Sequence, residues 1–219
     1  MVGHHVVFQP IVRIVDWQVV GYEALARFDD GRSPLAHLAD ARAKGTLVDL
    51  ELELISSAVE SCKSLKSDAL ITMNSSAETL VDERLPAVLS ERTHEWGIEL
   101  SEMSAVSFYE GLRQTVRSLG VALLLDDAGA RHSDIERVHN SNPSIVKVDK
   151  SVLQAAVDTV PDMAGLLMFC EAAHSVNAIA LAEGVETPAQ ARLLQDIGYE
   201  LGQGYLYGYP ALAEEWVGR

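Results

Sequence analysis

The chain has 219 residues, of which 48% are hydrophobic and 22% are charged, a composition typical of a globular protein with a substantial core. The formal net charge of −15 argues against a nucleic-acid duplex or an anionic membrane as a partner. No apolar run has the length of a membrane span, and the two cysteines lack the spacing of a zinc site. We therefore expect one domain over residues 1–219, cytoplasmic, with both thiols reduced.

The first two predicted strands form a hairpin. Residues 6–12 and 19–27 are apolar runs separated by only a few residues. Because a parallel neighbour needs a connection of about a dozen residues or more, these two strands should be antiparallel.

After the hairpin, predicted helices alternate with predicted strands. The strands are expected over 70–74, 96–102, 121–127, 145–149, 178–183 and 204–207. The helices are expected over 34–43, 47–65, 76–89, 104–119, 133–140, 151–174 (with Pro161 as a potential break), 187–198 and 211–217. Eight strands in this order favour an α/β fold: a modified (β/α)₈ TIM-type barrel with the first strand antiparallel to the rest. An open doubly wound sheet is the alternative, but its GxGxxG phosphate signature follows none of the strands.

Polar side chains occur repeatedly at the ends of these apolar runs. Glu23 is the first, within the run from Val19 to Arg27, where burial of a lone carboxylate is costly without a cation or donor. The full set comprises Glu23, Asn74, Glu99, Asp126, Asp127, Lys147, Glu183, Glu186 and Gln203, the last just before the final predicted strand. Taken singly, each has a structural explanation such as a turn cap or a solvent-exposed position. In a barrel, however, the C-terminal strand ends share one face, so these groups should meet in one cleft.

A cleft with so many carboxylates requires cations to neutralise them. All-oxygen ligands without Cys or His favour hard ions such as Mg²⁺, Mn²⁺ or Ca²⁺. The number of carboxylates suits two ions about 4 Å apart, bridged by one carboxylate, an arrangement that serves in-line water attack on a phosphodiester. The adjacent pair Asp126 and Asp127 suits the bridge, and Lys147 would orient or help deprotonate the attacking water, or stabilise the phosphate charge.

The segment from Tyr22 to Arg27 resembles the signature of the EAL-domain family, bacterial signalling phosphodiesterases that act on cyclic di-GMP. The similarity extends over nearly the whole chain through 8–11, 73–76, 99–102, 125–127, 146–149, 182–187, 203–206 and 208–210. It implies a barrel with a reversed first strand, a requirement for Mg²⁺ or Mn²⁺, and hydrolysis of cyclic di-GMP to linear pGpG.

The resemblance also implies a role for each matched residue. The first metal would be held by Glu23, Asn74, Glu99 and Asp126. The second would be held by Asp126, Asp127 and Glu183, the last directly or through water. Lys147 would contact the nucleophilic water, supported by Gln203 and Glu186. The substrate would contact Gln9, Leu25, Arg27 and Asp149, with Arg27 on a phosphate. Glu102 would steady the loop after Asp127 without binding metal.

One segment departs from the family pattern. The family has Phe-Gly-Thr-Gly-Tyr-Ser-Ser after the paired aspartates, whereas residues 128–134 here are Ala-Gly-Ala-Arg-His-Ser-Asp. In the family this loop places the second metal and builds a dimer contact, so we expect slow turnover and a weakened homodimer. The second hypothesis is a catalytically weak or inactive domain that acts as a cyclic di-GMP receptor or contacts a protein partner. A glycosidase, by contrast, would explain neither Lys147 nor Asn74.

Overall fold

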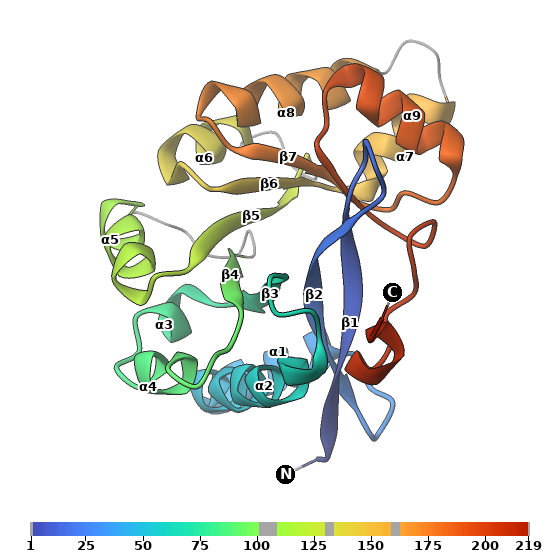
Figure 1. Cartoon of the computed structure of the whole chain (residues 1–219). Coiled ribbons are helices and arrows are strands. Elements are labelled where there is room, and N and C mark those ends of the chain that lie inside the picture. The colour runs from blue at the N-terminus through green and yellow to red at the C-terminus, as the bar shows by residue number, and fades with distance from the viewer. Residues whose placement is uncertain (1, 101–108, 130–133, 159–162, 219) are drawn as a thin grey trace.

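Eight strands close into a barrel in chain order (Figure 1). This computed structural model describes residues 2–100, 109–129, 134–158 and 163–218. The strands are β1 (His4–Arg13), β2 (Val19–Phe28), β3 (Leu70–Ser75), β4 (Glu95–Leu100), β5 (Ala122–Ala128), β6 (Ile145–Val148), β7 (Ile179–Ala182) and β8 (Leu201–Gln203). β1 is antiparallel to both β2 and β8, and all other neighbours are parallel. The predicted barrel with a reversed first strand is therefore confirmed.

The helices lie around the outside of the strands (Figure 1). The α-helices are α1 (Pro34–Lys44), α2 (Leu47–Ser61), α3 (Ala77–Leu80), α4 (Leu85–Leu89), α5 (Tyr109–Leu119), α6 (Asp134–Ser141), α7 (Lys150–Asp158), α8 (Met163–Ser175) and α9 (Pro188–Ile197). Two short 3₁₀ helices are η1 (Cys62–Ser64) and η2 (Ala213–Trp216). None of the helices in these described ranges is long and apolar enough to cross a membrane.

Three predicted helices are each divided in the structure. The helix expected over 47–65 is α2 followed by the short η1. The single helix expected over 76–89 is wrong, because Asp82 accepts hydrogen bonds from the backbone and side chain of Arg84 and forms a turn between α3 and α4. The helix expected over 151–174 is the pair α7 and α8. Pro161 lies between them, outside the described residues.

The C-terminal predictions require correction. The last strand is Leu201–Gln203, not 204–207, which form a turn. Gly204 has φ of 155°, and a Cβ there would lie 2.3 Å from the backbone of Val185. Because only glycine fits this close approach, the strand ends at Gln203, which therefore lies within β8 instead of preceding it. The helix expected over 211–217 is reduced to η2, where Trp216 donates a hydrogen bond to the carbonyl of Phe8, 2.9 Å away.

An apolar layer fills the barrel beneath its C-terminal end. It contains Ile11, Leu124, Ile145, Leu181 and Leu201, each from a different strand and each nearly inaccessible to solvent. Side chains two residues apart in a strand point to the same face. Each layer residue therefore has a polar neighbour directly above it, and these neighbours are Gln9, Asp126, Lys147, Glu183 and Gln203.

We expect Leu124→Ala to lower the free energy of unfolding by about 2–5 kcal/mol, because it opens a cavity in this closed layer. Leu35 is the matched control, since its side chain is 78% exposed, and Leu35→Ala should change stability by less than about 0.5 kcal/mol. Both are measured by denaturant unfolding of the purified protein. A loss at Leu124 no larger than at Leu35 would contradict the packing of this layer.

Candidate active site

The ammonium group of Lys147 lies at the centre of four carboxylates. Its Nζ is 2.5 Å from Glu99, 2.9 Å from Glu183, 3.0 Å from Asp126 and 3.4 Å from Glu23. The Lys147 side chain is 1% exposed. The barrel thus brings side chains from β2, β4, β5, β6 and the residue after β7 to one buried point, as the strand-end pattern predicts.

Amide side chains fix the position of Glu23. Asn74 in β3 donates a hydrogen bond to one carboxylate oxygen at 3.1 Å, and Gln203 in β8 donates to the other at 2.6 Å. The same Gln203 amide also donates to Gln9 in β1, 3.2 Å away. Glu23, the acidic residue that interrupts an apolar strand, is therefore buried with polar partners on both of its oxygens.

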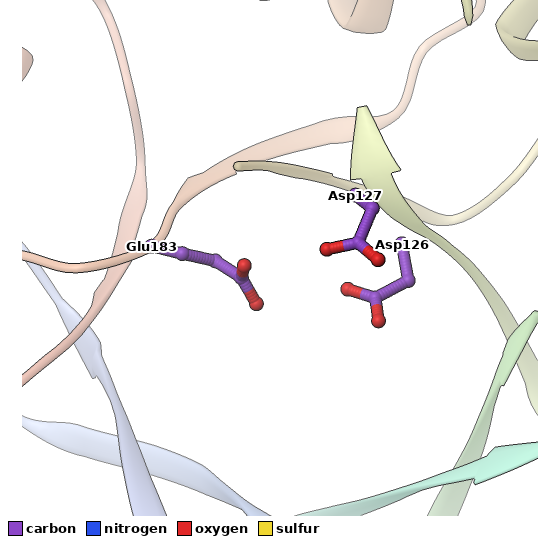
Figure 2. A group of neighbouring side chains, drawn as sticks. All are labelled: Asp126, Asp127 and Glu183. Carbon is purple, nitrogen blue, oxygen red and sulfur yellow. The ribbon is translucent and has the colours of Figure 1, made fainter. Parts of the chain in front are cut away.

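Asp126 and Asp127 are consecutive residues of β5, yet both carboxylates lie on the side of the strand that faces Glu183 (Figure 2). Asp127 has a left-handed backbone with φ of 54°, and the pairing of β5 with β6 is irregular between Leu125 and Ala128. Adjacent residues of a regular strand would point to opposite faces. Figure 2 shows the result, with both aspartates facing Glu183 across a small gap. One oxygen from each of the three carboxylates lies within 4.8 Å of the others.

Burial and the excess of negative charge shift the pKa values of the ionisable groups in this centre. Burial, reinforced by the charge of Glu23, raises the pKa of Glu99 well above its usual value. Burial likewise raises the pKa of Glu183 to about 7, against the opposing attraction of Lys147. For Lys147, burial favours the neutral amine, but the surrounding carboxylates outweigh it and raise the pKa well above the ordinary range. In the metal-free protein, the surrounding carboxylates therefore favour the protonated form of Lys147.

The donor set fits hard divalent cations. Every candidate ligand offers oxygen, and three carboxylates already lie close enough to share an ion. Two buried acceptors, one oxygen of Glu99 and the side-chain oxygen of Gln203, have no hydrogen-bond partner among the described residues. Buried acceptors normally find a partner, so these oxygens indicate a demand for positive charge beyond that of Lys147.

A cavity of about 190 Å³ opens beside this centre. Among its lining residues are Gln9, Glu23, Glu183, Glu186 and Gln203. Of the predicted residues, these five share the cavity, and Asn74, Glu99, Asp126 and Lys147 connect to it through the contacts above.

The other predicted substrate contacts are not among the cavity's lining residues. Arg27 donates to the carbonyl of Ala26 at 2.8 Å, and Leu25 is half-buried. Asp149 accepts from the backbone N–H of Ser151 at 2.9 Å, beside the start of α7. The predicted position of Glu102 falls outside the described residues.

Three residues near the site were given no role by sequence analysis. Tyr205 and Lys150 line the cavity, but both follow strand ends by two residues and carry no carboxylate signal. Glu51 is buried in α2 and accepts from the backbone and hydroxyl of Ser76, at 3.0 and 2.6 Å, which holds the loop after Asn74. Its signal is available in the sequence, because Glu51 lies four residues after Leu47 on the apolar stripe of its helix.

Comparison with protein families decides the classification. A model described as the EAL domain matches residues 3–210. The chain belongs to the EAL domain family. The probable cyclic di-GMP phosphodiesterase PdeI of Escherichia coli K12 is 29% identical over 96% of this chain. The chain spans only 29% of the length of PdeI, so it corresponds to one part of that relative.

Solved EAL structures share this architecture. The EAL enzyme Bd1971, in a form bound to cAMP and cyclic di-GMP, has a TM-score of 0.86 and 22% identity, covering 98% of this chain and 64% of its own. A manganese and cyclic di-GMP complex of Klebsiella pneumoniae BlrP1 has a TM-score of 0.83 and 23% identity, covering 96% of this chain and 56% of its own. At such identities these likenesses establish the fold.

The raised pKa of Glu183 predicts a pH dependence of stability in the metal-free protein. A carboxyl with a folded pKa of about 7 stabilises the fold fully below its unfolded pKa, near 4.5, and loses that contribution as the pH rises through 7. Glu183→Gln mimics the protonated form. In EDTA we therefore expect this variant to melt at a higher temperature than the wild type at pH 8, with the difference vanishing near pH 5. A constant difference across this range would contradict the raised pKa.

Proposed function

We propose that this chain is a metal-dependent phosphodiesterase that hydrolyses cyclic di-GMP to linear pGpG. The observation that carries the proposal is the convergence of four carboxylates on Lys147, with Asp127 beside them, at the C-terminal end of the barrel. In barrel enzymes this end carries the chemistry. Membership of the EAL family supplies the substrate class, because relatives such as PdeI bear the name of cyclic di-GMP phosphodiesterases.

Two Mg²⁺ or Mn²⁺ ions are the proposed cofactors. Glu23, Asn74, Glu99 and Asp126 would hold one ion, and Asp126, Asp127 and Glu183 would hold the other. Bound divalent ions neutralise phosphate charge and lower the pKa of a coordinated water. The chain's own contribution is a rigid set of oxygens, since Glu23 is held by Asn74 and Gln203, and Asp127 is turned inward by its left-handed backbone.

Lys147 acts as a donor in this proposal. Its ammonium lies within 3.4 Å of four carboxylates, a position from which it can donate a hydrogen bond to the attacking water or stabilise the phosphate charge. Gln203 and Glu186 would complete the network around the water, and Arg27, Gln9, Leu25 and Asp149 would position the nucleotide.

The proposal predicts that Glu23→Gln abolishes turnover while the barrel stays folded. Glutamine keeps a hydrogen-bonding side chain at this position but removes a ligand charge, so we expect a loss of about 100-fold or more. The measurement is formation of pGpG from cyclic di-GMP by chromatography with Mg²⁺ or Mn²⁺. Glu83→Gln is the control, because Glu83 is exposed and should keep wild-type activity. Near-native hydrolysis by Glu23→Gln would show that Glu23 binds no metal.

Divalent ions should also stabilise the metal-free protein. An ion that binds only the folded state adds about 2.7 kcal/mol at a free concentration one hundred times its dissociation constant. Thermal melting with Mg²⁺ or Mn²⁺, against NaCl of equal ionic strength, measures this gain. Asp127→Asn should reduce the gain, because it removes one of the three carboxylates that lie within 4.8 Å. A melting temperature that is indifferent to the divalent ion would contradict the metal site.

Residues 128–134 motivate a second candidate, a receptor that binds cyclic di-GMP and hydrolyses little of it. Ala128, where the family has Phe, is fully buried and packs in the same cluster as Phe169. Position 128 is therefore part of the core without an aromatic side chain, while residues 130–133 lie outside the described residues. Binding of cyclic di-GMP without pGpG formation, at any Mn²⁺ concentration, would favour the receptor over the enzyme.

A further inference from the structure

Two tyrosines form an exposed aromatic pair at the rim of the cavity. Tyr205 lines the cavity two residues after Gln203, and its ring is stacked on that of Tyr209. The ring centroids are 4.2 Å apart with an interplanar angle of 22°. Tyr205 is 53% exposed and Tyr209 is 64% exposed. No hydrogen bond recorded for the described residues uses either phenol hydroxyl, so the two ring faces are what this pair offers.

Tyr205 and Tyr209 do not pack in the hydrophobic core. Tyr207, which lies between the two in sequence, packs its ring against Gly202 and makes an edge contact with Trp17. Tyr205 and Tyr209 remain more than half exposed instead. Large aromatic side chains held at the surface beside a cavity are typical of a ligand-binding position, since leaving them in water has no structural benefit.

The backbone that carries the pair is fixed. Leu206 donates to the carbonyl of Val185 at 3.0 Å, and Tyr207 and Gly208 donate to the carbonyl of Gly204 at 3.1 and 3.2 Å. Gly204 also lies too close to Val185 for any side chain. Tyr205 therefore projects from a hydrogen-bonded turn and Tyr209 follows that turn directly, so a ligand that stacks on them meets a segment already held by main-chain bonds.

The size of the cavity indicates which part of a bound cyclic dinucleotide would lie at the cavity rim. At about 190 Å³, it is smaller than the range of about 300–1,000 Å³ that encloses a drug-sized ligand. A cyclic dinucleotide with one phosphodiester at the carboxylates must therefore extend beyond the cavity, with a base near the rim. Neutral aromatic faces suit a base, and they add no negative charge to a chain that already carries −15.

We propose that Tyr205 and Tyr209 form a stacking platform for a purine base of the nucleotide. Tyr205 would contact the base directly, and Tyr209 would support the opposite face of the Tyr205 ring. This inference rests on the proposed function, which it extends by assigning base recognition to the turn after β8. Stacking of one base on an aromatic side chain corresponds to about a 5- to 150-fold change in affinity.

The test compares alanine and phenylalanine variants at both positions. Calorimetric titration with cyclic di-GMP in the presence of Ca²⁺ gives the dissociation constant. Tyr205→Ala and Tyr209→Ala should weaken binding, with Tyr205→Ala in the range of about 5- to 150-fold, and Tyr205→Phe and Tyr209→Phe should bind within about twofold of the wild type. Trp17→Ala is the matched control, since Trp17 is also an exposed aromatic, 51% accessible, but is not among the cavity's lining residues. Unchanged melting temperatures establish that the variants fold.

GMP and ribose 5-phosphate, which lacks the base, separate stacking from phosphate binding. The alanine variants should bind GMP more weakly than the wild type does, and they should bind ribose 5-phosphate as well as the wild type does. Equal weakening of both probes, equal losses in the Ala and Phe variants, or unchanged binding of cyclic di-GMP by the alanine variants would overturn the platform while leaving the proposed function intact. If the wild type binds neither cyclic di-GMP nor GMP, both proposals fail.

Discussion

The buried ammonium of Lys147 is the interaction on which the rest of the site depends. One cation faces four carboxylates within 3.4 Å, and Asp127 adds a fifth nearby. The centre is therefore short of positive charge, and in a dry site the deficit can be met only by protons or by further cations. The raised pKa values of Glu99 and Glu183 mean that protonation of these carboxyl groups is one way to offset the negative charge. Divalent ions are the other way to offset the negative charge. Unlike protons on the carboxylates, they could also neutralise the charge of a bound phosphate.

The geometry of this centre follows from the alternation of side chains in strands. Leu124, Ile145, Leu181 and Leu201 fill the barrel interior, and the residue two positions later in each case is a member of the site. Because both sets belong to the same strands, the apolar layer holds the charged layer above it. This is why the convergence of these side chains could be predicted from sequence: a polar residue that ends an apolar run marks the C-terminal edge of the barrel. The hairpin argument likewise predicts the reversed first strand.

Some features that sequence analysis missed depend on contacts between distant segments, and others depend on local turns. β8 has only three residues, and its end is set by Gly204 against Val185, which no local pattern reveals. The division between α3 and α4 is set by the Asp82–Arg84 turn, which competes locally with helix. Tyr205 carries no charge signal, and its position beside the cavity appears only in the structure. The turn at Asp127 was also missed, because the residue type does not reveal its left-handed backbone.

The centre and the rim are parts of one backbone unit. Val185 donates to the carbonyl of Gln203 at 3.0 Å and accepts from Leu206 at 3.0 Å, so the turn after Glu183 is bonded to β8 and to the segment that carries Tyr205. These bonds use main-chain groups, and they hold regardless of which side chains stand at 205 and 209. A base platform on this turn can therefore vary in chemistry without moving Glu183 or Gln203. Conversely, a substitution at Gly204 should disturb the centre and the rim together, because it forces Val185 away from both.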